Sequence, residues 1–240
     1  MSFLGLICIP FTYYAILINL YGSANAPEGY RFVKLSDFWR TLVGGAITIV
    51  IKKICFFILP HIYRPIAKGE TEEHKDRYCK KAADHSFRFV YFTFATIWGW
   101  SLMKEFPYLP PSIGGPDNGT FFNLKMDTIY LEYNPELLSY SCWTFGYHFG
   151  NLIETVFLEE RREDFAEMVL HHVAAFFLYF GFIYGNLVPL GSIVAYFHDI
   201  ADVPLQFGKV WSATRLEPLT IVGVLFLIPA WFWTRLVLLP

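Results

Sequence analysis

Seven apolar stretches recur along this chain, and each is long enough to cross or nearly cross a lipid bilayer. A transmembrane helix needs about 20 mostly apolar residues, so the pattern predicts an all-α polytopic membrane protein with about seven hydrophobic helices. The stretches are Phe3–Tyr21, Leu42–Ile62, Phe87–Met103, Leu137–Leu158, Phe165–Ile183, Leu187–Phe207 and Leu219–Leu239.

The composition supports this fold class. Hydrophobic residues make up 55% of the chain and charged residues only 17%, against about 25% charged residues in a typical soluble domain. The formal net charge of −2 lacks the basic excess of a nucleic-acid-binding protein. Lys52 and Lys53 lie inside the second stretch, where their side chains could snorkel, or the stretch could lie against the helix bundle or at the interface.

Basic residues are concentrated on one side of the predicted bundle. The loop from Tyr63 to Arg88 is the richest in them, with Arg64, Lys68, Lys75, Arg77, Lys80, Lys81 and Arg88. By the positive-inside rule this side faces the cytosol, or the matrix in a mitochondrion. The N-terminus then lies on the basic side and the C-terminus on the opposite side. The run Gly69–Asp84 carries charges of both signs and is predicted to be a solvated connector.

The first apolar stretch precedes Ala24-Asn25-Ala26, which resembles the cleavage site of a signal peptide. No Lys or Arg precedes the stretch, so we predict that it is retained as a helix. The predicted organisation is therefore an N-terminal hydrophobic helix with its linker at residues 1–35 and a main transmembrane domain at residues 36–240.

Two neighbouring apolar stretches near the C-terminus contain ionisable side chains. An ionisable residue in the middle of a spanning helix costs roughly 2.5–3.5 kcal/mol on insertion scales, which packing alone does not explain for five of them. We therefore expect the function to lie in this pair of helices. The residues are His171 and His172 in the first stretch and His198, Asp199 and Asp202 in the second.

Helix geometry predicts that the two clusters converge. His171 lies about six residues, or roughly 9 Å, into its helix from the basic side, and Asp202 lies about five residues from the end of the returning helix. The short link between the helices makes them antiparallel neighbours. A carboxylate beside a histidine fixes its tautomer and stabilises the imidazolium, as a general base or a nucleophilic imidazole requires.

Other roles are compatible with the same residues. His171 and His172 are adjacent, so they point about 100° apart on a helix and cannot both face one centre equally. One of them could simply hydrogen-bond to a neighbouring helix, a common role of polar residues in membrane bundles. Three histidines and two aspartates could also hold a metal ion, although no ligand spacing here is diagnostic. These alternatives stay open from the residues alone.

A longer pattern surrounds these residues in the last third of the chain. It comprises Arg162, Asp164-Phe165, Glu167-Met168, His171-His172, Leu178, Asn186, Gly191, Val194, His198-Asp199, Asp202, Leu205, Lys209, Thr234-Arg235-Leu236 and Pro240. With this pattern the chain resembles the ceramide synthases, within the wider TLC family of membrane proteins. Phe87-Arg88-Phe89 and the segment 133–145 resemble the preceding helices of that family, so the resemblance covers roughly residues 45–240.

The resemblance implies a TLC-type helical barrel that transfers a fatty acyl group from acyl-CoA to the amine of a sphingoid base, with no cofactor and no metal. One of His171 or His172 would act as base or transient acyl acceptor. His198, Asp199 and Asp202 would orient it, bind the amine and stabilise charge. Asn186 and Lys209 would contact substrate, and membrane lipids would surround the protein in the endoplasmic reticulum.

Departures from the family pattern support an alternative. Ala175, Phe182-Ile183, Pro189 and Gln206 stand where the family usually has Thr, Ser-Tyr, Arg and Glu. The family also continues into one further span after Thr234-Arg235-Leu236, which the domain 36–240 is predicted to lack. The alternative is a non-catalytic subunit of a larger membrane complex, for instance in the mitochondrial inner membrane, with protein partners that close the bundle. A lipid-binding or lipid-transporting protein would use the same cavity without chemistry.

Overall fold

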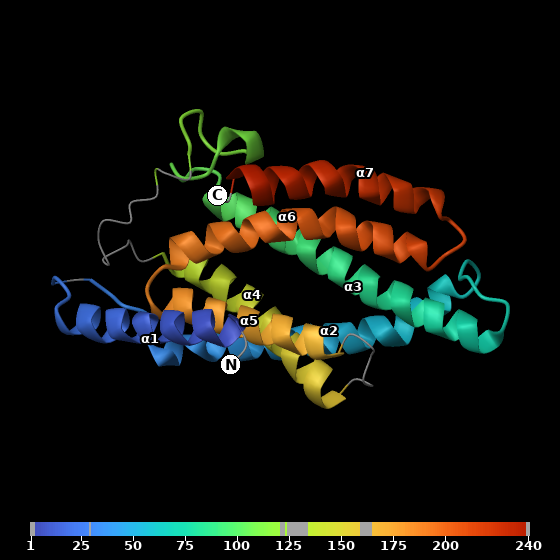
Figure 1. The fold of residues 1–240 in the computed structure, drawn as a ribbon, viewed down its shortest axis with the longest axis horizontal. Coiled ribbons are helices and arrows are strands. Elements are labelled where there is room, and N and C mark those ends of the chain that lie inside the picture. The colour runs from blue at the N-terminus through green and yellow to red at the C-terminus, as the bar shows by residue number, and fades with distance from the viewer. Residues whose placement is uncertain (1–2, 29, 121–122, 124–133, 159–164, 239–240) are drawn as a thin grey trace. The chain divides into compact units, whose positions relative to one another are not determined.

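The computed structural model describes residues 3–28, 30–120, 123, 134–158 and 165–238. Each predicted apolar stretch forms a helix (Figure 1). Two helices end in a π-helical segment, η4 (Glu154–Leu158) after α4 and η5 (Trp233–Leu238) after α7. The helices are α1 (Phe3–Ala24), α2 (Trp39–Tyr63), α3 (Glu72–Met103), α4 (Pro135–Ile153), α5 (Phe165–Tyr184), α6 (Val188–Ser212) and α7 (Pro218–Phe232).

Among the described residues, three helical segments are long and apolar enough to cross a membrane: Leu35–Tyr63, Phe165–Tyr184 and Pro218–Leu238. The first joins the short 3₁₀ helix η1 (Leu35–Phe38) to α2, and the last joins α7 to η5. The predicted fold class, an all-α integral membrane protein, is thereby confirmed. Arg162, Asp164 and Pro240 of the family pattern lie outside the described residues.

The prediction of a solvated connector at Gly69–Asp84 is wrong, because α3 begins at Glu72. The start of α3 is charged on one side only. Cys79, Ala82, Ala83 and Ser86 are buried along it at helical spacing. A charged helix that buries a narrow stripe of small residues carries little apolar signal in sequence.

The chain forms two compact units. Unit 1 comprises Met1–Ile49 and Leu102–Ile193, and unit 2 comprises Val50–Ser101 and Val194–Pro240. In unit 1, α5 packs against both α1 and α4. The amide of Asn19 on α1 donates to the carbonyl oxygens of Val33 and Tyr184, at 2.9 and 2.7 Å, which ties the end of α1 to the end of α5.

Helices α2 and α4 meet in unit 1 at glycines. A Cβ added to Gly146 would lie 2.6 Å from the carbonyl oxygen of Thr41 and 2.7 Å from the nitrogen of Gly45. Both atoms belong to backbone, which cannot yield as a flexible side chain can. A Cβ added to Gly44 would meet its nearest atom, the Cα of Trp143, at 3.4 Å, an ordinary contact.

We therefore expect Gly146→Ala to destabilise the protein by about 1–3 kcal/mol, the usual cost of overpacking, although alanine favours a helix over glycine by about 1 kcal/mol. Gly44→Ala is the matched control, and we expect it to be neutral or slightly stabilising. Chemical denaturation of both variants in detergent micelles measures the difference. Equal stability of the two variants would contradict the close approach at Gly146.

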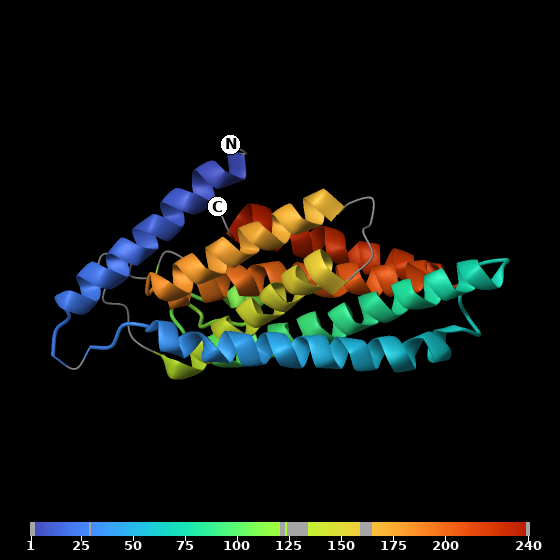
Figure 2. The same ribbon diagram turned by 90° about the horizontal axis from the view of Figure 1, so that it is seen from below.

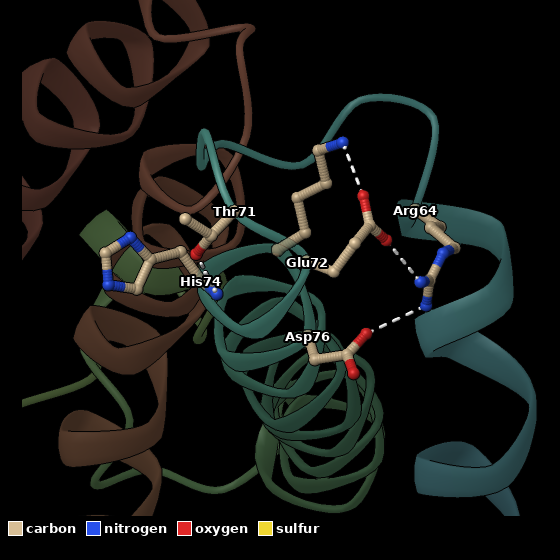
Figure 3. A network of polar contacts seen from close by, with 6 residues as sticks. Arg64, Thr71, Glu72, His74 and Asp76 are labelled. Carbon is tan, nitrogen blue, oxygen red and sulfur yellow. Dashed lines mark hydrogen bonds and ion pairs between the residues drawn. The ribbon is translucent and has the colours of Figure 1, made fainter.

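In unit 2, the connection from α2 to α3 (Figure 2) is braced by an exposed polar network (Figure 3). Arg64 donates to Glu72 at 2.6 Å and to Asp76 at 2.8 Å, and Lys75 donates to Glu72 at 2.9 Å. The hydrogen bonds from Lys75 and Arg64 hold the pKa of Glu72 below its usual value. Such exposed ion pairs contribute little to stability, so the network mainly defines where α3 begins.

Lys52 and Lys53 differ sharply in unit 2. Lys53 is exposed, whereas the Lys52 side chain is only 3% exposed, and its Nζ lies 3.8 Å from an oxygen of Asp84 on α3. Arg88 lies one turn further along α3 and contacts the other carboxylate oxygen of Asp84 at 2.9 Å. Lys52 therefore turns toward α3, which agrees with the predicted alternative that this stretch lies against the bundle.

Candidate functional site

The two adjacent histidines of α5 differ in burial. His172 is only 5% exposed, whereas His171 is exposed. This follows from helix geometry, because adjacent residues point about 100° apart and only one can face the interior of unit 1. Of the two predicted catalytic histidines, burial therefore selects His172 as the one that faces other helices.

A third histidine, His148 on α4, lies beside His172 in unit 1. The centroids of the two rings are 6.4 Å apart, and the His148 ring also contacts Tyr179 of α5 at 5.0 Å. Tyr179 in turn stacks on Phe145 of α4, with ring centroids 5.8 Å apart. His148 was not among the predicted site residues, although it is an ionisable residue within the apolar stretch Leu137–Leu158, the same signal that identified the other histidines.

The three predicted site residues of α6 also differ in burial. Asp199 is 4% exposed, while His198 is exposed and its Nδ1 donates to the carbonyl oxygen of Val194 at 2.8 Å. Asp202 is half-buried, and one of its carboxylate oxygens lies 3.6 Å from Arg235 in η5. Of the three predicted residues, Asp199 is therefore buried, Asp202 contacts η5 within unit 2, and His198 faces out.

The two predicted substrate contacts lie in different environments. Asn186 occupies the turn between α5 and α6 with φ at 60°, a left-handed conformation that asparagine tolerates well. Its buried side-chain amide donates to the hydroxyl of Tyr30 at 3.0 Å, which gives Asn186 a structural role in this turn. Lys209 is exposed near the end of α6. Contact of either residue with substrate stays a prediction.

The candidate residues belong to both units. His148, His171 and His172 lie in unit 1, and His198, Asp199 and Asp202 lie in unit 2. Their predicted convergence at one depth stays a prediction. Within the ranges that the structure describes, no three His, Cys, Asp or Glu side chains are grouped so that they could hold a metal ion. Unit 1 offers the buried imidazole of His172 beside Tyr179 and the half-buried His148, and unit 2 offers the buried carboxylate of Asp199 and the half-buried carboxylate of Asp202.

Comparison with known families gives one match over most of the chain. The TLC domain family matches residues 81–240, which include most of α3, the helices α4 to α7 and every residue of the candidate site. The match therefore includes the helices that carry the buried His172 and Asp199.

Curated relatives of the chain are named ceramide synthases. Ceramide synthase hyl-1 of Caenorhabditis elegans is 32% identical over 67% of this chain and 41% of its own length. Ceramide synthase hyl-2 of the same organism is 25% identical over 92% of this chain and 67% of its own length. Human ceramide synthase 4 is 29% identical over 72% of this chain and 41% of its own length. The chain thus spans about two fifths to two thirds of the length of these relatives.

Proposed function

The chain belongs to the TLC domain family, and on this premise we propose that it is an acyl-CoA-dependent N-acyltransferase that acylates a sphingoid base. The observation that carries the proposal is the burial of His172 and Asp199 in helices of a membrane protein. Buried ionisable groups are costly in such helices and usually mark a functional site. The ceramide synthase names of its relatives supply the substrate class.

The proposed reaction joins two lipid-soluble chains. The amine nitrogen of the sphingoid base attacks the thioester carbonyl carbon of acyl-CoA, so a C–N bond forms and the C–S bond breaks. His172 would take the proton that the amine loses, and the CoA sulfur would leave as a thiol once it is protonated. In the covalent variant, the imidazole of His172 accepts the acyl group first and the amine displaces it.

The other residues have supporting roles in this proposal. Asp199 and Asp202 would receive the ammonium group of the sphingoid base before it loses its proton. Lys209, an exposed cation at the end of α6, would face the anionic head of CoA. The endoplasmic reticulum is the proposed location, and the mitochondrial inner membrane is the alternative.

An N-acyltransferase assay tests the proposal directly. Purified protein in lipid is supplied with acyl-CoA of several chain lengths and a sphingoid base, alongside the double variant His171→Ala, His172→Ala. We expect N-acylated product from the unmodified protein and none from the double variant. The alternative is a non-catalytic membrane subunit, which the outward orientation of His171 and His198 favours. Absence of product from folded protein at every chain length would contradict the enzyme and favour the subunit.

A further inference from the structure

His148 lies where α4 and α5 pack against each other in unit 1. On α5, His172 and Tyr179 are seven residues apart, so they lie on the same face of that helix, about two turns from each other. The His148 ring contacts both of them, with centroid distances of 6.4 Å to His172 and 5.0 Å to Tyr179. His148 therefore lies directly beside the histidine to which the proposed reaction assigns the chemistry.

Aromatic packing on both sides holds the His148 ring in place. Tyr179 stacks on Phe145 of α4, with the two ring planes within 2° of parallel. Phe176 of α5 contacts both Phe145, at 5.2 Å, and Phe149, at 5.8 Å. Phe145 and Phe149 lie before and after His148 along α4, so α5 contacts this helix on both sides of the histidine. A side chain whose neighbours are fixed by packing can be preorganised for acid–base chemistry.

The distance between the two imidazoles suits a reaction that uses both. A reacting atom midway between the rings would lie about 3.2 Å from each centroid, half of 6.4 Å, which is within reach of proton exchange with either ring. The rings differ in burial, because His172 is 5% exposed and His148 is half-buried. An apolar acyl group favours the buried ring, whereas a base that must release a proton in every turnover favours the more accessible one.

We propose that His148 is a second catalytic residue, which acts as the base while His172 carries the acyl group; this inference rests on the covalent form of the proposed function. The neutral imidazole of His172 attacks the thioester carbonyl carbon, so a C–N bond forms, the C–S bond breaks and CoA leaves as a thiolate. The amine then attacks the acyl carbon, displaces the imidazole of His172 and passes one proton to His148. His148 returns that proton to the thiolate, so the products are the amide and CoA as the thiol.

The test separates the two half-reactions. The full chain in phosphatidylcholine nanodiscs is incubated with acyl-CoA alone, acyl-protein is measured by intact mass spectrometry, and free acyl-CoA is removed by gel filtration. Either a sphingoid base or hydroxylamine is then added, and transfer of the acyl group is timed. Hydroxylamine is unprotonated near neutral pH and attacks acyl groups without help from a base, so it reports on the acyl-protein alone. His172→Phe, which lacks the proposed acyl acceptor, should give no acyl-protein.

His148→Phe keeps a ring against Tyr179 but removes both nitrogen atoms. We expect it to form acyl-protein as the unmodified chain does and to transfer the acyl group to hydroxylamine at an unchanged rate. Transfer to the sphingoid base should fall about 10²–10⁴-fold, the usual contribution of a general base. Phe149→Leu is the matched control, because Phe149 is the next residue of α4, is also half-buried and contacts Phe176 of α5. Its two transfer rates should keep the ratio that the unmodified chain shows.

Other results would overturn the inference. Equal losses toward both nucleophiles in His148→Phe would reduce His148 to a packing residue, and an unchanged rate toward the sphingoid base would leave it without a part in catalysis. Product formed without any acyl-protein would exclude the division of roles between the two histidines. Absence of product from the unmodified chain would instead contradict the proposed function itself, and the inference would fall with it.

Discussion

His172→Ala is expected to reduce the N-acyltransferase rate by at least about 100-fold, whereas His171→Ala should retain most of it. General acid–base catalysis by a side chain typically contributes about 10²–10⁴ in rate. Only a histidine that faces the interior can make that contribution here. His172 is 5% exposed, and His171 is exposed on the same helix.

The two single variants form a matched pair, since they remove the same side chain from adjacent positions of α5. His172→Ala should also lower the stability of the protein, because the ring contacts of this buried side chain with His148 are lost along with the imidazole. His172→Phe keeps a ring in that place and should remain inactive if the nitrogen atoms matter. Full activity of His172→Phe would reduce His172 to a packing residue, and a larger loss in His171→Ala than in His172→Ala would reverse the assignment.

The helices of this protein were predictable because their signal is local. Each spanning stretch is recognisable by its length and its apolar residues. The predicted stretch Phe165–Ile183, for example, ends one residue before the end of α5 at Tyr184. The start of α3 was missed for the same reason. Its buried stripe of Cys79, Ala82 and Ala83 is masked by charged neighbours on the exposed side, so the apolar signal begins only at Phe87.

The helices that carry the candidate site were predictable, but the directions in which its side chains face were not. Ionisable residues in apolar helices pointed to α5 and α6, yet which of two adjacent histidines faces inward depends on how the helix is rotated against its neighbours. That rotation is set by tertiary packing, such as the stacking of Tyr179 on Phe145. The contact of Asp202 with Arg235 was missed because it joins two helices, and a single sequence carries no periodic pattern for such a pair. The signal for His148 was present, since it is an ionisable residue within the apolar stretch Leu137–Leu158.

Asp84→Asn is expected to destabilise the protein by about 3–5 kcal/mol, the usual cost of breaking a buried ion pair. The Asp84 carboxylate stands between two cations, Lys52 at 3.8 Å and Arg88 at 2.9 Å. Asparagine has nearly the same shape, so the variant changes the charge and little else. Lys52, whose side chain is 3% exposed, then loses the carboxylate that balances its ammonium group.

Asp76→Asn is the matched control on the same helix. Asp76 contacts Arg64 at 2.8 Å, a shorter distance than that between Lys52 and Asp84, but both side chains of this pair are more than half exposed. An exposed ion pair contributes only about 0–1 kcal/mol, so this variant should be almost neutral. The free energy of unfolding of both variants is measured by denaturation in detergent micelles, where equal losses would contradict a buried pair.

A double variant separates the charge of Lys52 from its packing. If the cost of Asp84→Asn arises from a buried ammonium group left without its carboxylate, adding Lys52→Met should recover a large part of the lost stability. Methionine keeps an unbranched apolar side chain in the same space, and replacement of buried ion pairs by apolar residues is often neutral or stabilising. Arg88 limits the recovery, because it also loses Asp84 and is itself only 18% exposed. If Lys52→Met instead lowers the free energy of unfolding further, the cost of Asp84→Asn does not arise from an unbalanced charge on Lys52.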